Sequence, residues 1–208
     1  MTDIERRGGG LGIEAKAADG RRTLAGYAVV FNSEARIGDW FNERIAPGAF
    51  DRALATDADV RALIDHNSGR VIGRTKSGTL RLAVDERGLK VEIDVPDTAD
   101  GRDLMVLVER GDISGMSFGF RVTKQEWDES GDTPLRTIQS VDLYEVSVVA
   151  FPAYNDTSIA MRSLEALRVE GGAEAERRAQ NAAAAARRIA EKRAAAEQKF
   201  RGIRQDAS

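Results

Sequence analysis

Residues 115–120 read Gly-Met-Ser-Phe-Gly-Phe, and this stretch decides the fold class. Successive side chains of an extended chain point to opposite faces of a sheet. The three large apolar residues of the stretch therefore share one face, whereas Ser117 and Gly119 share the other. Because one face is large and apolar and the other is small, the stretch is predicted to be a strand that buries its apolar face in a core. On the other face, the small hydroxyl stands beside a residue without a side chain, and we expect this surface to admit an extended substrate backbone.

Short segments of the same kind recur through residues 1–162, and Gly, Asp and Asn separate them. Even spacing of short strands favours a barrel or a sandwich. Two helices interrupt the series: one starts at Pro47 and runs to Leu54, and the other spans about 99–110 with Gly111 as its stop. The expected strands are 11–17, 23–31, 36–45, 60–64, 71–75, 79–84, 89–95, 113–122, 136–141 and 144–150.

The C-terminal part has a different composition. Ala, Arg, Glu and Lys dominate residues 174–201, which lack Pro and Gly and are therefore predicted to be helical. Gly171-Gly172 predicts a hinge before this helix. We thus expect a β-rich domain at 1–162, and a hinge and helical extension at 163–208. Because the apolar side of the helix is mostly Ala, either a solvated helix or a partner-binding helix fits the pattern.

The composition excludes several classes of protein. The 208 residues are 42% hydrophobic and 31% charged, which is typical of a globular protein. No apolar run approaches the roughly 20 residues of a membrane span, and we do not expect the charged N-terminus to be a secretory signal. Without cysteine, thiolate catalysis and cysteine zinc sites are excluded. A net charge of -3 gives no reason to expect nucleic acid as a partner, so we expect neither a membrane nor nucleic acid.

The chain has a single histidine, His66, which follows a short apolar run. A serine hydroxyl needs an adjacent base near neutral pH, and neutral imidazole suits that role. Glu145 lies in an apolar strand, where a carboxylate is costly to bury without a partner such as a histidine N–H. Ser117, His66 and Glu145 can therefore act as nucleophile, base and orienting carboxylate.

Each of these residues also has an ordinary structural interpretation. Ser117 can be a packed strand serine, and His66 can be a surface residue at the end of a strand. Glu145 can form a salt bridge with Arg74 or Arg121 instead of contacting a histidine. The competing residues are Ser114 for the nucleophile and Asp65 or Asp142 for the carboxylate.

Other hydrolytic and nucleotide chemistries find no support in the sequence. The chain has no H-E-x-x-H or EF-hand spacing, no paired Asp-Thr/Ser-Gly loops and no glycine-rich phosphate loop before a helix. We therefore expect no metal and no cofactor.

Six stretches carry a resemblance to a known family, and they occur in one order along residues 20–162. They are Leu24–Phe31, Glu43–Phe50, Leu63–Asn67, Val71–Arg74, Gly111–Phe120 and Leu143–Tyr154. Together they resemble the prohead (procapsid maturation) proteases of tailed phages. Because six ordered stretches agree, the resemblance is more specific than any single motif.

The resemblance implies a fold and a set of site residues. The family is distantly similar to the herpesvirus assembly proteases, which implies a mainly β fold with flanking helices. We expect a herpesvirus-protease-like β-barrel, followed here by a C-terminal Ala/Arg/Glu-rich helix. The resemblance also implies that Ser117 is the nucleophile and His66 the base. Those relatives use two histidines, and this chain has one, so we expect Glu145 to be the third member.

The resemblance further implies a serine endopeptidase that acts during head maturation. It would cleave the scaffolding segment of the major capsid protein, or a separate scaffold protein, and also itself. Its place would be the assembling prohead in the cytoplasm of the bacterial host, with self-association left open. The Ala-rich tail resembles a scaffold-like or targeting extension.

Two alternatives belong to other classes. A non-enzymatic head-assembly or scaffold protein could keep the fold and use the tail for docking. A small-molecule esterase-like hydrolase would need a closed apolar pocket rather than an open groove lined by strands.

Overall fold

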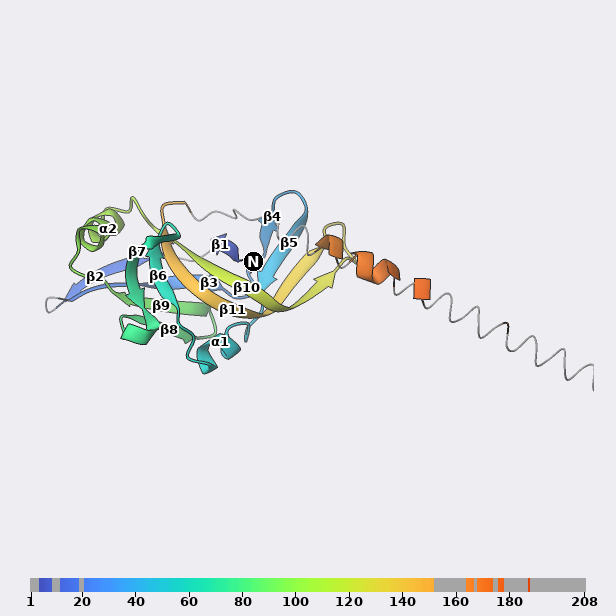
Figure 1. Ribbon diagram of the computed structural model, residues 1–208. Coiled ribbons are helices and arrows are strands. Elements are labelled where there is room, and N and C mark those ends of the chain that lie inside the picture. Colours follow the sequence, from blue (N-terminus) through green and yellow to red (C-terminus); the bar gives the residue numbers. More distant parts are fainter. Residues whose placement is uncertain are drawn as a thin grey trace, which may run out of the picture. The chain divides into compact units, whose positions relative to one another are not determined.

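The computed structural model describes residues 4–8, 12–18, 21–151, 164–166, 168–173, 176–177 and 187. The chain divides into two compact units, residues 1–160 and 161–208. The first unit holds every strand found among the described residues, and it is mainly β as predicted (Figure 1).

A long antiparallel pair, β10 and β11, forms the centre of a seven-stranded sheet (Figure 1). Strand β1 pairs with the outer edge of β10. The opposite edge of β11 is shared by β5 near its start and β6 near its end, and both lie parallel to it. The strands of this sheet are β1 (Glu5–Gly8), β4 (Ala35–Ile37), β5 (Phe41–Ile45), β6 (Arg61–Ile64), β7 (Asn67–Arg74), β10 (Gly115–Asp128) and β11 (Leu135–Val149).

A second, antiparallel sheet has the order β2-β3-β9-β8. Its strands are β2 (Glu14–Ala18), β3 (Arg21–Val30), β8 (Leu80–Val84) and β9 (Gly88–Asp94). Three short elements complete the unit: α1 (Asp51–Ala55), the 3-10 turn η1 (Thr75–Ser77) and α2 (Ala99–Glu109).

The second helix begins and ends where the sequence indicates. The side chain of Thr98 accepts a hydrogen bond from the backbone N–H of Gly101 at 3.2 Å and thereby caps the first turn. Gly111 follows the helix with φ of +80°, a left-handed conformation that glycine adopts without steric cost. The predicted stop is therefore confirmed.

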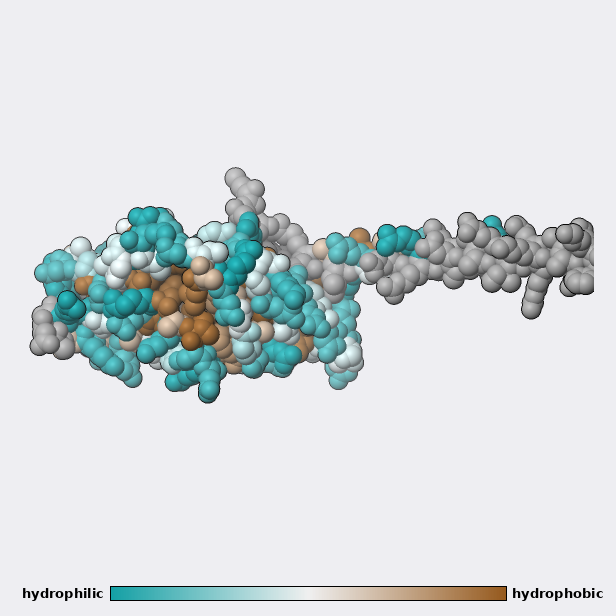
Figure 2. Space-filling view, turned by 90° about the horizontal axis from the view of Figure 1, so that it is seen from below, coloured by the Kyte–Doolittle hydropathy of each residue, from teal (hydrophilic) through white to brown (hydrophobic). Residues whose placement is uncertain are grey.

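The apolar faces of both sheets and of the helices share one core. Phe118 and Phe120 of β10 are buried, with ring centroids 4.6 Å apart, and Phe50 packs edge-on against Phe118. The alternation predicted from residues 115–120 is thus confirmed on its apolar side. The visible surface is mostly hydrophilic, with apolar residues gathered in one central area (Figure 2).

The predicted closed barrel is not found, because the described strands form two open sheets. Along one edge, β11 pairs first with β5 and then with β6, which are both short and parallel to it. The sheet therefore branches at this edge instead of closing on itself. Several boundaries were also wrong. The helix predicted from Pro47 begins at Asp51, and the strand predicted at 71–75 is β7, which begins at Asn67. The strand predicted at 36–45 is the hairpin β4–β5, and the strands predicted at 136–141 and 144–150 are one strand, β11. β1 was not predicted at all, since its residues are mainly charged.

Little of the C-terminal unit is described. Gly171 and Gly172 are helical, and the hinge predicted at this pair stays a prediction. Most of the helix predicted at 174–201 lies outside the described residues, and the domain boundary at 162 stays a prediction. In the part of the chain that the structure describes, no helix is long and apolar enough to cross a membrane.

Candidate active site

Ser117 lies near the start of β10, where its Cα pairs with Ser147 of β11 on one side and with Gly8 of β1 on the other. Its side chain is 1% exposed. The hydroxyl donates a hydrogen bond to the backbone carbonyl of Arg7 at 2.8 Å. The candidate nucleophile is therefore in contact with the N-terminal strand.

His66 lies in the two-residue turn between β6 and β7. Asp65 and His66 have φ of 48° and 57°, which is the left-handed pair of a type I′ hairpin turn. Because β6 runs parallel to the end of β11, this turn is held against that strand. The backbone N–H of Asp65 donates to the carbonyl of Val148 at 3.0 Å, and that of His66 donates to Oγ of Ser147 at 3.3 Å.

The structure brings His66 and Glu145 into direct contact. Nδ1 of the imidazole lies 2.6 Å from Oε1 of the carboxylate, although the two residues are 79 positions apart. A carboxylate oxygen accepts from an N–H, so a proton on Nδ1 makes this contact a hydrogen bond and leaves Nε2 as the basic nitrogen. Glu145 pairs with Gly119, which lies two residues after Ser117 on β10. The side chains of Glu145 and Ser117 therefore lie on the same face of the sheet.

The carboxylate of Glu145 occupies the space that Gly119 leaves open. A Cβ at Gly119 would lie 2.5 Å from Oε1 of Glu145. The expectation that this glycine keeps a bare surface for a substrate backbone was therefore wrong. The missing side chain accommodates the carboxylate instead.

Two further neighbours of Glu145 were not predicted. The hydroxyl of Ser147 donates to Oε2 at 2.6 Å, and Nε of Arg6 lies 3.8 Å from Oε1. Ser147 stands two residues after Glu145 and so shares its face, which the strand alternation of the sequence already indicates. Arg6 belongs to β1, and nothing in the local sequence places it near residue 145.

The competing residues have other partners. Arg74 forms its ion pair with Asp59 at 2.7 Å, and Arg121 pairs with Asp142. Asp65 accepts a hydrogen bond from the backbone N–H of residue 150 at 3.3 Å. Ser114 is exposed in the loop before β10.

A second group of charges is buried near β10, on the core side. Two carboxylates, Glu5 and Glu43, bind two guanidinium groups, Arg7 and Arg136, at distances of 2.7 to 3.2 Å. We call these four residues the ion cluster; each is at most 3% exposed. The ion cluster joins β1 to β5 and β11, and sequence analysis missed it.

Contacts within the ion cluster shift the pKa values of Glu5 and Arg136. Burial alone would raise the pKa of Glu5, but the hydrogen bonds and charges of Arg136 and Arg7 hold that pKa below its usual value. Burial opposes the charge of Arg136 as well, yet Glu5 and Glu43 raise its pKa. Glu5 and Arg136 therefore stay ionised around neutral pH.

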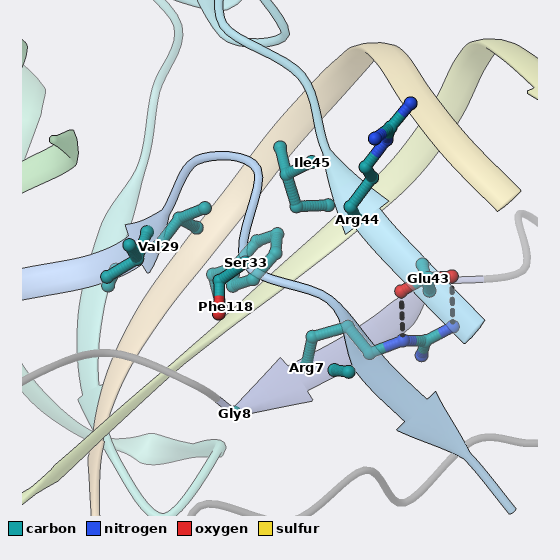
Figure 3. A pocket seen from close by; sticks show the side chains of 11 residues that line it. Arg7, Gly8, Val29, Ser33, Glu43, Arg44, Ile45 and Phe118 are labelled. Carbon is teal, nitrogen blue, oxygen red and sulfur yellow. Dashed lines mark hydrogen bonds and ion pairs between the residues drawn. The ribbon is translucent and has the colours of Figure 1, made fainter. Parts of the chain in front are cut away.

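A cavity of about 50 Å³ borders the ion cluster (Figure 3). Arg7 and Glu43 line it, together with Ser33, Arg44 and Phe118, and Figure 3 shows the ion pair between the first two. Ser117 is not among its lining residues. The described residues contain no group of three His, Cys, Asp or Glu side chains that could hold a metal ion.

Comparison with known proteins gives the class of the chain. A model of the caudovirus prohead serine protease family matches residues 11–170, so the chain belongs to this family of serine proteases. The resemblance stated from the sequence is thereby confirmed.

Individual relatives make the same point. The prohead protease of Enterobacteria phage HK97 is 34% identical over 155 residues, which cover 72% of this chain and 64% of the relative. The prohead protease of Escherichia phage T5 is 33% identical over 96 residues, which cover 46% of this chain and 42% of the relative. The matched part of the chain thus spans less than two thirds of either relative.

One solved structure shares the fold. The bacteriophage T4 capsid assembly protease, gp21, aligns with a TM-score of 0.51 at 9% identity. The alignment covers 71% of this chain and 97% of that one. At this identity the likeness concerns the fold alone.

Proposed function

We propose that the chain is a serine endopeptidase of head maturation, in which Ser117 is the nucleophile, His66 the general base and Glu145 the orienting carboxylate. The observation that carries the proposal is the 2.6 Å contact between Nδ1 of His66 and Oε1 of Glu145. This contact lies on the sheet face that also carries Ser117. Family membership supports the serine protease class.

In the proposed reaction each of the three side chains has one role in moving a proton. Nε2 of His66 takes the proton of the Ser117 hydroxyl as the oxygen attacks a peptide carbonyl, and it later passes that proton to the leaving amine. Glu145 holds the ring in the required tautomer and stabilises the imidazolium that forms. The Ser117 hydroxyl now donates to the Arg7 carbonyl, so it must exchange this acceptor for His66 before it attacks.

The proposed substrate is the scaffolding segment of the major capsid protein, or a scaffold protein, with self-cleavage as a second event. The names of the HK97 and T5 relatives support a role in the prohead. We place the enzyme inside the assembling prohead in the host cytoplasm.

The two alternatives have less support. A purely structural head protein has no need of a buried carboxylate aligned with the only histidine of the chain. A small-molecule esterase would need an apolar pocket at the nucleophile, and the cavity of Figure 3 is lined by Phe118 rather than Ser117.

The test is co-expression of the chain with the capsid protein of its phage, with fragments identified by intact mass. The wild-type chain should yield defined capsid-protein fragments, and Ser117→Ala should yield none while it remains folded. Ser114→Ala is the matched control, because it removes an exposed hydroxyl three residues away, and it should cleave normally. Wild-type fragments from folded Ser117→Ala would contradict the proposal.

A further inference from the structure

We infer that Ser147 is a positioning residue of this site: it fixes the Glu145 carboxylate in the orientation that holds His66. The inference rests on the proposed function. Ser147 lies on β11 directly opposite Ser117 and is 0% exposed, yet the proposed reaction gives its hydroxyl no chemical step.

The hydroxyl of Ser147 makes two hydrogen bonds, and both bear on the site. It donates to Oε2 of Glu145 at 2.6 Å, and it accepts the backbone N–H of His66 at 3.3 Å. One hydroxyl thus joins the carboxylate to the turn that carries the imidazole. With Oε2 held by Ser147, Oε1 is left to face Nδ1 of His66 at 2.6 Å.

Gly119 limits the carboxylate from the other side. A side chain there would meet Oε1 at 2.5 Å and Cγ at 2.9 Å, so the carboxylate fits only against a bare backbone. Glu145 is therefore confined between Gly119 and the hydroxyl of Ser147. A carboxyl group with one free oxygen could rotate about its last torsion, and its hydrogen bond to His66 would then be lost for part of the time.

Loss of the Ser147 hydroxyl should reduce turnover rather than substrate binding, because Ser147 acts through Glu145 and His66. A hydrogen bond to a charged group typically changes a rate or an equilibrium by about 10- to 100-fold. We expect Ser147→Ala to lower the cleavage rate at saturating capsid protein by about this factor, with little change in KM. Ser140→Ala is the matched control, since Ser140 lies on the same strand and its hydroxyl bonds to Thr123, away from the site.

A second readout does not depend on cleavage. Because His66 is the only histidine, selective ¹⁵N labelling of histidine shows the two ring nitrogens of a single imidazole. In the Ser117→Ala background, the Nδ1–H proton should exchange slowly with water when Ser147 is intact. It should exchange faster in Ser117→Ala/Ser147→Ala, and it should not change in Ser117→Ala/Ser140→Ala.

The outcomes separate this inference from the proposed function. If folded Ser147→Ala keeps both the wild-type rate and slow exchange, Ser147 does not position the site, even where Ser117→Ala is inactive. If Ser117→Ala still cleaves, the proposed function fails, and the exchange measurement alone then decides the role of Ser147. If Ser147→Ala does not fold, Ser147→Cys replaces it, since a thiol fills the site, being somewhat larger than a hydroxyl, and is only a weak donor. An unchanged rate and unchanged exchange in Ser147→Cys would overturn the inference.

Discussion

Glu43 and Glu145 are both buried in the same sheet, but they have different partners. Glu43 binds two guanidinium groups, Arg7 and Arg136, whose charge does not change at any ordinary pH. Glu145 binds an imidazole and a hydroxyl at 2.6 Å each, and its only guanidinium neighbour in the described structure, that of the part-exposed Arg6, lies farther away at 3.8 Å. The first arrangement ties three strands together, whereas the second holds a group that can take up and release a proton. The partner, rather than burial, thus separates a structural carboxylate from one that can serve a reaction.

The largest expected effect is the loss of the base. His66→Ala should lower the cleavage rate by roughly 10⁴-fold or more, because the Ser117 hydroxyl then has no proton acceptor. The fold should persist, since the turn is held by backbone hydrogen bonds. The rate of capsid-protein cleavage is the measurement, with Asn67→Ala, at the next position, as the control. Cleavage by folded His66→Ala within tenfold of wild type would remove His66 from the site.

Breaking the ion cluster should affect stability most. Glu43→Gln leaves Arg7 and Arg136 short of a countercharge in a buried place, and such changes cost about 3–5 kcal/mol. Denaturant unfolding of Glu43→Gln and Glu145→Gln gives the comparison. We expect a much smaller loss for Glu145→Gln, because glutamine still offers an oxygen to Nδ1 of His66. Equal losses would mean that the two carboxylates do the same structural work.

The same pair of variants should rank in the opposite order for activity. Glu145→Gln removes the charge that stabilises the imidazolium, so we expect the cleavage rate to fall by on the order of 10²-fold or more. Asp142→Asn is the control, because it removes a charge from the same strand but from a carboxylate paired with Arg52 and Arg121. Unchanged cleavage in Glu145→Gln would exclude Glu145 as the orienting carboxylate.

Acid should separate activity from folding. The lowered pKa of Glu5 means that its stabilising charge is fully present above the ordinary glutamate value of about 4.3 and is lost as pH falls through the lower value. Imidazole side chains in general take up their proton at a higher pH than carboxylates do, within about pH 5 to 8. Cleavage rate and circular dichroism, recorded over the same pH series, should therefore show a folded but inactive protein at the acid end of that range. A flat rate from pH 8 to 5 would contradict the role of His66.

The smallest effect on chemistry is expected from the C-terminal residues. A chain that ends at Glu170 should cleave denatured capsid protein at the wild-type rate, since both buried carboxylates belong to the first unit. We expect it to fail to enter proheads, because the Ala-rich tail is our candidate for docking to scaffold. Peptide cleavage and copy number per prohead are the two measurements. Normal packaging of the truncated chain would show that the tail has no targeting role. Loss of cleavage by the truncated chain would show that the tail belongs to the catalytic domain.

The sequence by itself determined the features that depend on local pattern. The alternation at 115–120 identified the buried face of β10, and Gly111 marked the end of the second helix. The single histidine reduced the possible chemistries to a few. It directed attention to Ser117 and Glu145, whose roles remain predictions.

Only the tertiary structure decided what depends on pairing between distant strands. Glu5 and Arg7 look like a solvated N-terminus until β1 is placed beside β10 and their charges meet Glu43 and Arg136. Gly119 looks like a bare substrate surface until the register sets Glu145 opposite it. The period of a strand says which side chains share a face, but the register between strands says which of them touch. That register is set by the long-range packing of the whole sheet, which no local stretch of sequence contains.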